Sequence, residues 1–199
     1  MNLLLKNIAF ISGLCLAFSF TSGPTHVSTT NDDNYVYWSE RKLTWSDFQG
    51  KVPADSKFDA LTHSAISLDY EGQGVTLKFN IESIFDPRKS WKKEGVNQYI
   101  LQHEQVHFDI TEYHARVLRK KLKTNRYKSI DTVNDEIRSM FNDSFTKANE
   151  MQLKYDEQTN HSMNRKKQRK WNKKIKKLLK KTRSYKHPKL KVDISYLLG

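Results

Sequence analysis

The sequence predicts a domain of the α+β class, and three observations lead to this prediction. Residues 58–81 hold alternating apolar and polar positions around a glycine-containing break, which is typical of two paired strands. From residue 95 onward, apolar residues recur at three- and four-residue steps in three successive stretches, as they do in amphipathic helices. The strands precede the helices instead of alternating with them, which favours a small sheet packed on helices within one domain.

The first 19 residues have the pattern of a secretory signal peptide. A short segment with one lysine precedes an apolar run from Ile8 to Phe20, which is too short to span a membrane. Ala17 and Ser19 have the spacing of a signal-peptidase site. We therefore expect a protein that is secreted or held in the cell envelope. Cys15 is the only cysteine, so the mature chain would have neither a disulfide nor a thiol ligand.

The next segments divide into a leader and a domain. Residues 20–34 are rich in Ser, Thr, Asn and Asp, which predicts a flexible leader, and we expect the ordered domain to cover residues 35–181. Residues 43–50 combine aromatics with a closing glycine, which indicates a turn. The hairpin of residues 58–81 follows. The Asp86-Pro87-Arg88 break then leads into the first helix.

The first predicted helix, residues 95–122, carries the pattern HExxH. His103 and His107 are four residues apart, so they lie one turn apart on one helix face and can bind one zinc ion. Glu104 has the position from which a carboxylate accepts the proton of a zinc-activated water. A plain surface helix is the alternative. The apolar positions around the pattern direct the histidine face toward the interior, which favours the metal site.

The second and third predicted helices differ in character. Apolar positions from Ile130 to Met151 predict a core helix, which a polar segment, residues 155–162, follows. Residues 164–181 predict a basic amphipathic helix, and residues 182–199 a basic tail. Residues 164–191 hold 15 Lys and Arg and no acid, which leaves 20 basic and 22 acidic residues elsewhere. The net charge of +13 is therefore local. The helix could bind an anionic surface or simply be solvated, and no nucleic-acid motif accompanies it.

Zinc in a catalytic site usually has three protein ligands, so the histidine pair needs a partner. Asp109 and Glu112 are rotated away from the histidine face of the helix. His114 has the right face but lies about 10 Å further along the helix axis. The polar segment after the second helix can fold back over the site, and there the residues leave His161 and Asp156 open as the third ligand.

Three blocks of this sequence resemble the DUF922 family of predicted secreted zinc-dependent bacterial proteases. The blocks are LTWSDFQG at 43–50, HEQVHFDITE at 103–112 and YDEQTNH at 155–161. The resemblance implies a zincin-like fold, Zn²⁺ as cofactor, and His161 rather than Asp156 as the third ligand. Ser162 departs from the family pattern, which has glycine after the last histidine.

The predicted reaction is hydrolysis of peptide bonds by zinc-activated water, with Glu104 as general base, as in a secreted zinc endopeptidase. The hairpin of residues 58–81 would pair with an extended peptide substrate. Tyr155 would donate a hydrogen bond to the oxyanion, and Asp109 or Glu112 would orient a ligand imidazole. Two alternatives stay open, a non-catalytic zinc-containing protein that binds the cell envelope and a zinc hydrolase of non-peptide substrates.

Overall fold

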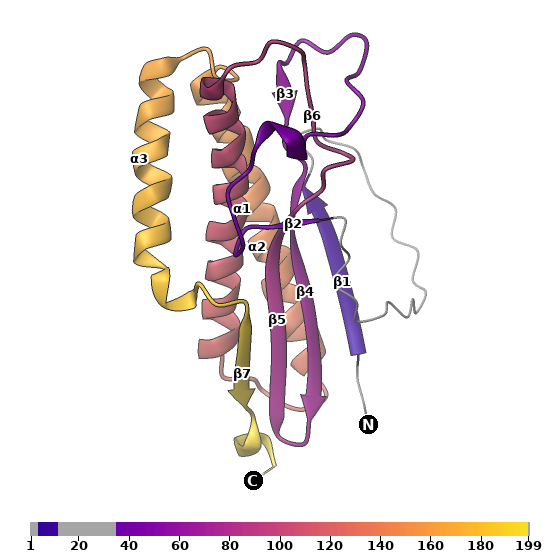
Figure 1. Cartoon of the computed structure of the whole chain (residues 1–199). Coiled ribbons are helices and arrows are strands. Elements are labelled where there is room, and N and C mark those ends of the chain that lie inside the picture. The colour runs from indigo at the N-terminus through magenta and orange to yellow at the C-terminus, as the bar shows by residue number, and fades with distance from the viewer. Residues whose placement is uncertain (1–3, 12–34, 199) are drawn as a thin grey trace.

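The computed structural model describes residues 4–11 and 35–198, with side chains for 35–198, as an α+β fold (Figure 1). The strands are β1 (Leu4–Ile11), β2 (Val36–Tyr37), β3 (Ala60–Leu61), β4 (Ser64–Gln73), β5 (Thr76–Phe85), β6 (Trp91–Lys92) and β7 (Lys189–Asp193). The helices are α1 (Gln98–Thr124), α2 (Val133–Thr159) and α3 (Arg165–Lys181). The main sheet has the order β1-β4-β5-β2, with β7 also paired to β5, and β3 pairs with β6 in a separate ribbon.

The predicted hairpin is β4 and β5, which are antiparallel over their whole lengths. Gly74 makes the turn with a φ of +58°, a conformation that suits glycine because it has no Cβ. Buried and partly exposed positions alternate along β5, so one face of the sheet lies against the helices. The alternation that predicted the hairpin therefore reflects a sheet with one covered face.

The helix α1 is the centre of the domain, with the sheet on one side and α2 and α3 on the others (Figure 1). It begins at Asn97, whose side chain accepts hydrogen bonds from the backbone of Tyr99 and Ile100. The helix α2 extends to Thr159, eight residues beyond the last apolar position that predicted it. The helix α3 begins after Asn164 and confirms the predicted range within one residue.

Among the described residues, three apolar clusters hold the layers together, and one of them joins residues 36–48 to Phe85 of β5 and Phe108 of α1. The largest lies between the sheet, the C-terminal half of α1 and the N-terminal half of α2, and includes Ile66, Ile81, Leu118 and Phe141. The second joins the three helices near the HExxH pattern, where Tyr155 and Trp171 pack on Val106, Ile110 and Ile175. Because α3 contributes its apolar stripe to this second core, its basic residues are all left on the solvent side.

The segment 43–50 forms a short 3₁₀ helix, Trp45–Asp47, at the outer side of α1. Gly50 follows it where the backbone is tightly enclosed, because an added Cβ would lie 2.7 Å from the carbonyl oxygen of Arg88. The Gly50 amide donates to the carbonyl oxygen of Ser90 at 2.8 Å. The glycine that indicated a turn is therefore required by close packing against the segment before α1.

The two ends of the chain add strands that the sequence did not predict. The region predicted as a basic tail contains β7, which pairs antiparallel with β5. The region predicted as a signal peptide contains β1, which pairs with β4, while residues 12–19 and the predicted leader lie outside the described residues. The cleavage of residues 1–19 stays a prediction. Among the residues that the structure describes, no helix has the length and hydrophobicity that crossing a membrane requires.

Candidate metal centre

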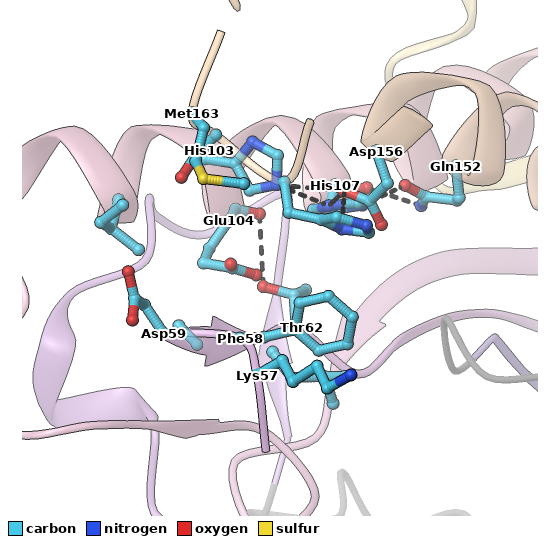
Figure 2. A pocket seen from close by; sticks show the side chains of 15 residues that line it. Lys57, Phe58, Asp59, Thr62, His103, Glu104, His107, Gln152, Asp156 and Met163 are labelled. Carbon is cyan, nitrogen blue, oxygen red and sulfur yellow. Dashed lines mark hydrogen bonds and ion pairs between the residues drawn. The ribbon is translucent and has the colours of Figure 1, made fainter. Parts of the chain in front are cut away.

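The helix α1 brings His103 and His107 together one turn apart, as their spacing predicted. Their Nε2 atoms are 3.2 Å apart and both rings face the end of α2 (Figure 2). His103 is buried and His107 is partly buried. Glu104, the next residue on α1, is buried as well and lines the cavity beside the histidine pair.

The third donor atom comes from Asp156, in the last turn of α2. Its Oδ1 lies 3.1 Å from the Nε2 of His103 and 3.0 Å from that of His107. Among the described residues, these three side chains form the cluster that could hold a metal ion. The ligand atoms of a tetrahedral metal site with bonds of about 2.0–2.1 Å lie about 3.3 Å apart, and the sides of the observed triangle, 3.0–3.2 Å, are close to that distance.

His161, which the resemblance favoured as the third ligand, lies at the rim of the cavity instead. Its Nδ1 is 3.9 Å from the Oδ1 of Asp156, its side chain is 45% exposed, and its ring packs against that of Phe58. The reason is the length of α2. Because the helix continues through Asp156, the carboxylate points at the histidine pair and the imidazole follows in the turn after the helix.

Two glutamines fix the tautomers of the histidine pair. The Gln152 Oε1 lies 2.6 Å from the Nδ1 of His107, and its amide nitrogen donates to the carbonyl oxygen of His107 at 2.9 Å. That carbonyl can only accept, so Oε1 is the atom that faces Nδ1 and Nδ1 carries the proton. The Gln168 Oε1 accepts in the same way from His103 Nδ1 at 2.8 Å, while its amide nitrogen donates to Tyr155 and Asn172.

With both Nδ1 atoms protonated, each imidazole in its neutral form has its lone pair on Nε2, directed at the Asp156 carboxylate. Three converging acceptors without a shared positive charge repel one another, so the cluster favours a cation. Burial opposes protonation of His107, but the Asp156 carboxylate overrides it and raises the pKa of His107 to about 9. Burial likewise opposes the charge on Asp156, but the two imidazoles hold the pKa of that carboxyl well below its usual range. A metal ion would supply the same positive charge to all three donors.

Tyr155 does not face the cavity. Its hydroxyl is fully buried, donates to the carbonyl oxygen of His103 at 3.2 Å and accepts from the amide nitrogen of Gln168. Burial raises the pKa of Tyr155 well above its usual value. The ring stacks on His103 with centroids 4.6 Å apart. The predicted role as an oxyanion donor does not fit this placement, and Tyr155 instead holds His103 in place through ring stacking and the hydrogen bond to its carbonyl oxygen.

The two acids predicted to orient an imidazole have other partners. Asp109 accepts from Trp38 Nε1 at 2.7 Å and from Lys42 Nζ at 2.9 Å, which fastens the segment before residue 50 to α1. Glu112 forms a buried ion pair with Arg116 and Arg119. The imidazoles are oriented by Gln152 and Gln168, which the sequence reading missed as ligand partners. The available signal was a glutamine on the inward face of α2, one turn before Asp156.

A cavity of about 440 Å³ opens over the cluster. The floor is α1 with His103, Glu104 and His107, one side is the end of α2 and the following turn, and the other side is the segment 57–62 (Figure 2). Phe58, Ile100 and Met163 make part of this lining apolar. The cluster is therefore buried on the protein side and open toward the cavity.

Residues 48–162 match the family model described as a bacterial protein of unknown function, DUF922. The chain belongs to the DUF922 family. The matched DUF922 region contains the histidine pair, Glu104, Asp156 and His161, whereas Gln168 lies beyond it on α3. No curated protein and no solved structure matches the chain.

Proposed function

We propose that this DUF922 protein is a secreted zinc-dependent metallopeptidase with a zincin-like active site. One observation carries the proposal: three lone-pair donors, from His103, His107 and Asp156, converge within about 3 Å of one another at the base of an open cavity. Two imidazoles and one carboxylate are a ligand set that suits zinc and leaves a fourth position toward the cavity. A site of that kind is catalytic more often than structural.

Zinc in such a site polarises a substrate carbonyl and lowers the pKa of bound water. The protein's own residues would do the remaining work. Glu104 lies next to His103 and faces the cavity, so its carboxylate would accept the proton of the attacking water and pass it to the leaving amine. Gln152 and Gln168 would keep the imidazoles in the tautomer that binds metal.

The shape of the cavity favours an extended peptide as substrate. In the described part of the chain, β3 pairs with β6 along one edge, and its other edge borders the cavity. Lys93 donates its amide to the carbonyl oxygen of Asp59 on the β6 side, so the backbone groups of the next residue, Ala60, would point to the opposite edge. A peptide could add to this edge as a further strand. The platform would thus be the first residues of the predicted 58–81 segment and not the β4–β5 hairpin itself.

Secretion and envelope attachment belong to the same proposal. The signal-peptide pattern of residues 1–19 favours export. The exposed Lys and Arg residues of α3 offer a positively charged surface to anionic components of the envelope.

The test uses mature protein purified with and without Glu104→Gln. We expect about one zinc per chain in both proteins by elemental mass spectrometry, and cleavage of a synthetic peptide library only by the wild type. Glu94→Gln, the same change at an exposed position, is the matched control and should retain zinc and cleavage.

Cleavage by Glu104→Gln at the wild-type rate would contradict the proposed general base. Stoichiometric zinc without cleavage of any library peptide would favour the non-catalytic envelope protein. Hydrolysis of esters or non-peptide amides alone would favour a zinc hydrolase of another class.

A further inference from the structure

His161 lies at the cavity and is held there without being part of the metal cluster. It lines the cavity together with Glu104 and Asp156, and its Nδ1 atom lies 3.9 Å from the Oδ1 atom of Asp156. The ring packs on Phe58 with centroids 4.5 Å apart, and the side chain remains 45% exposed. One ring nitrogen is therefore close to the candidate metal position while the imidazole remains accessible to a ligand.

The backbone at His161 is strained. Asn160, His161 and Ser162 have φ values of 48°, 47° and 74°, so three consecutive residues are left-handed. A helix end usually needs one such residue, which Asn160 supplies, and residues such as His161 and Ser162 cost about 1–2 kcal/mol each in this conformation. Ser162, at the position where the family pattern has glycine, has the largest positive φ of the three residues. Strain of this kind persists where surrounding contacts impose it, and it concentrates at functional sites.

The contacts that impose the strain come from both helices. The His161 amide donates to the carbonyl oxygen of Asp156 at 3.0 Å, which ties the turn to the metal cluster. The Tyr99 hydroxyl, from the start of α1, donates to the carbonyl oxygen of Ser162 at 2.5 Å. The Asn164 amide donates to the carbonyl oxygen of Thr159 at 2.7 Å. These bonds fix the turn before any ligand enters.

The distances suit a hydrogen-bond donor better than a fourth ligand. The three clustered donor atoms lie within 4.8 Å of one another, and no ring nitrogen of His161 joins that group. A substrate oxygen in the fourth position of a tetrahedral site would lie about 3.3 Å from Asp156 Oδ1. The His161 Nδ1 is 3.9 Å from the same Oδ1, so it can lie a hydrogen-bond length of about 2.9 Å from that substrate oxygen.

We propose that His161 is a catalytic residue that donates a hydrogen bond from Nδ1–H to the substrate carbonyl oxygen as that oxygen becomes negative. This inference rests on the proposed function and supplies the oxyanion donor that Tyr155 cannot provide. No proton leaves His161 in this step. Glu104 takes the proton of the attacking water, and the hydrogen bond from His161 strengthens as negative charge develops on the oxygen.

The test compares His161→Ala, His161→Leu and His161→Asn. Asparagine tolerates the left-handed backbone, and its amide nitrogen occupies nearly the place of Nδ1. Two probes are titrated into each zinc-loaded protein. One is a phosphinic peptide, which has a second oxygen at the oxyanion position, and the other is a thiol peptide of the same sequence, which has none. Zinc affinity and thermal unfolding are measured in parallel, with Asn160→Gly as the control in the same turn.

We expect the Ala and Leu variants to bind the phosphinic peptide about 10- to 100-fold more weakly, with unchanged zinc and thiol-peptide affinity. His161→Asn should recover most of the loss. On a peptide that the wild type cleaves, kcat should fall about 100-fold in the Ala variant while KM changes little.

Equal phosphinate affinity in all variants would overturn the inference and leave the proposed function intact. A large loss of zinc affinity in His161→Ala would instead make His161 a ligand. If the zinc-loaded wild type binds neither probe and cleaves no peptide, the proposed function and this inference both fail.

Discussion

Replacing Gln152 with leucine tests whether the observed hydrogen bonds prepare the histidine pair for metal. The side chain is buried, its Oε1 accepts from His107 Nδ1 at 2.6 Å, and its amide nitrogen donates to the His107 carbonyl oxygen at 2.9 Å. Leucine has a similar volume but no polar atoms. The variant therefore leaves one buried N–H donor without its partner and frees the imidazole to rotate and to change tautomer.

We expect Gln152→Leu to lower both the zinc affinity and the free energy of unfolding. Loss of an outer hydrogen bond to a ligand histidine weakens metal binding by about 10- to 100-fold, which is about 1.4–2.8 kcal/mol. The metal-free protein should also lose about 1–3 kcal/mol of unfolding free energy, because a buried donor is left unsatisfied. Competition with a chromophoric chelator at pH 7.5 gives the zinc affinity, and urea unfolding of the metal-free protein gives the stability.

Gln102→Leu is the control, because it makes the same chemical change at an exposed position of α1. It should leave both quantities within error of the wild type. Wild-type zinc affinity in Gln152→Leu would refute the assigned tautomer and, with it, the argument that three lone pairs converge on one position. A loss of stability without a loss of zinc affinity would have the same consequence.

Three further predictions concern the rest of the molecule. Gly50→Ala should lower the unfolding free energy by at least about 2 kcal/mol in urea titrations, since its Cβ would lie 2.7 Å from the Arg88 carbonyl oxygen; wild-type stability would contradict the packing described. Burial lowers the pKa of His114 to about 4, and neither ring nitrogen has a hydrogen-bond partner among the described residues. In the unfolded chain His114 gains a proton near pH 6.5, whereas in the folded protein it stays neutral down to about pH 4. Above pH 6.5 His114 therefore does not lower the free energy of unfolding, but by pH 5 it lowers that free energy by about 2 kcal/mol. Between pH 7.5 and pH 5, the unfolding free energy of His114→Phe should fall by about 2 kcal/mol less than that of the wild type. An equal fall in both proteins would contradict the burial of a neutral His114. If α3 (Arg165–Lys181) attaches the protein to an anionic envelope, binding to anionic vesicles should weaken steeply between 0.05 and about 0.5 M salt, whereas absent or salt-independent binding would indicate a solvated helix.

The elements that the sequence predicted well are those with a regular apolar pattern. The β4–β5 hairpin, α1 and α3 all bury one face against apolar neighbours, so period-2 or helical spacing identified them. The spacing of His103 and His107 likewise follows from helix geometry alone. The strand β7 was missed because its pattern of mostly charged residues belongs to an edge strand with one buried valine, Val192.

The end of α2 was misjudged for a physical reason. Apolar spacing stops at Met151, yet the helix continues to Thr159 with an inward face that includes Gln152, Tyr155 and Asp156. Gln152 and Asp156 make this face polar where it borders the histidine pair, while Tyr155 packs into the apolar cluster beside it. Hydrophobic periodicity cannot recognise a buried polar face, so residues 155–162 were predicted as a polar segment that follows the helix. The choice between Asp156 and His161 depended on this helix end.

The two polar faces of α1 explain why one sequence block combines several acids and amides with the histidines. His103, Glu104 and His107 face the cavity, whereas Gln105 and Asp109 face the segment that precedes residue 50. The Gln105 side chain accepts from the Leu43 amide and donates to Asp109. An acid next to a metal motif is easily interpreted as a partner of the metal ligands. Here the helical rotation of about 100° per residue directs Gln105 and Asp109 to the opposite side of α1. There they hold residues 38–43 against the helix that carries the histidine pair.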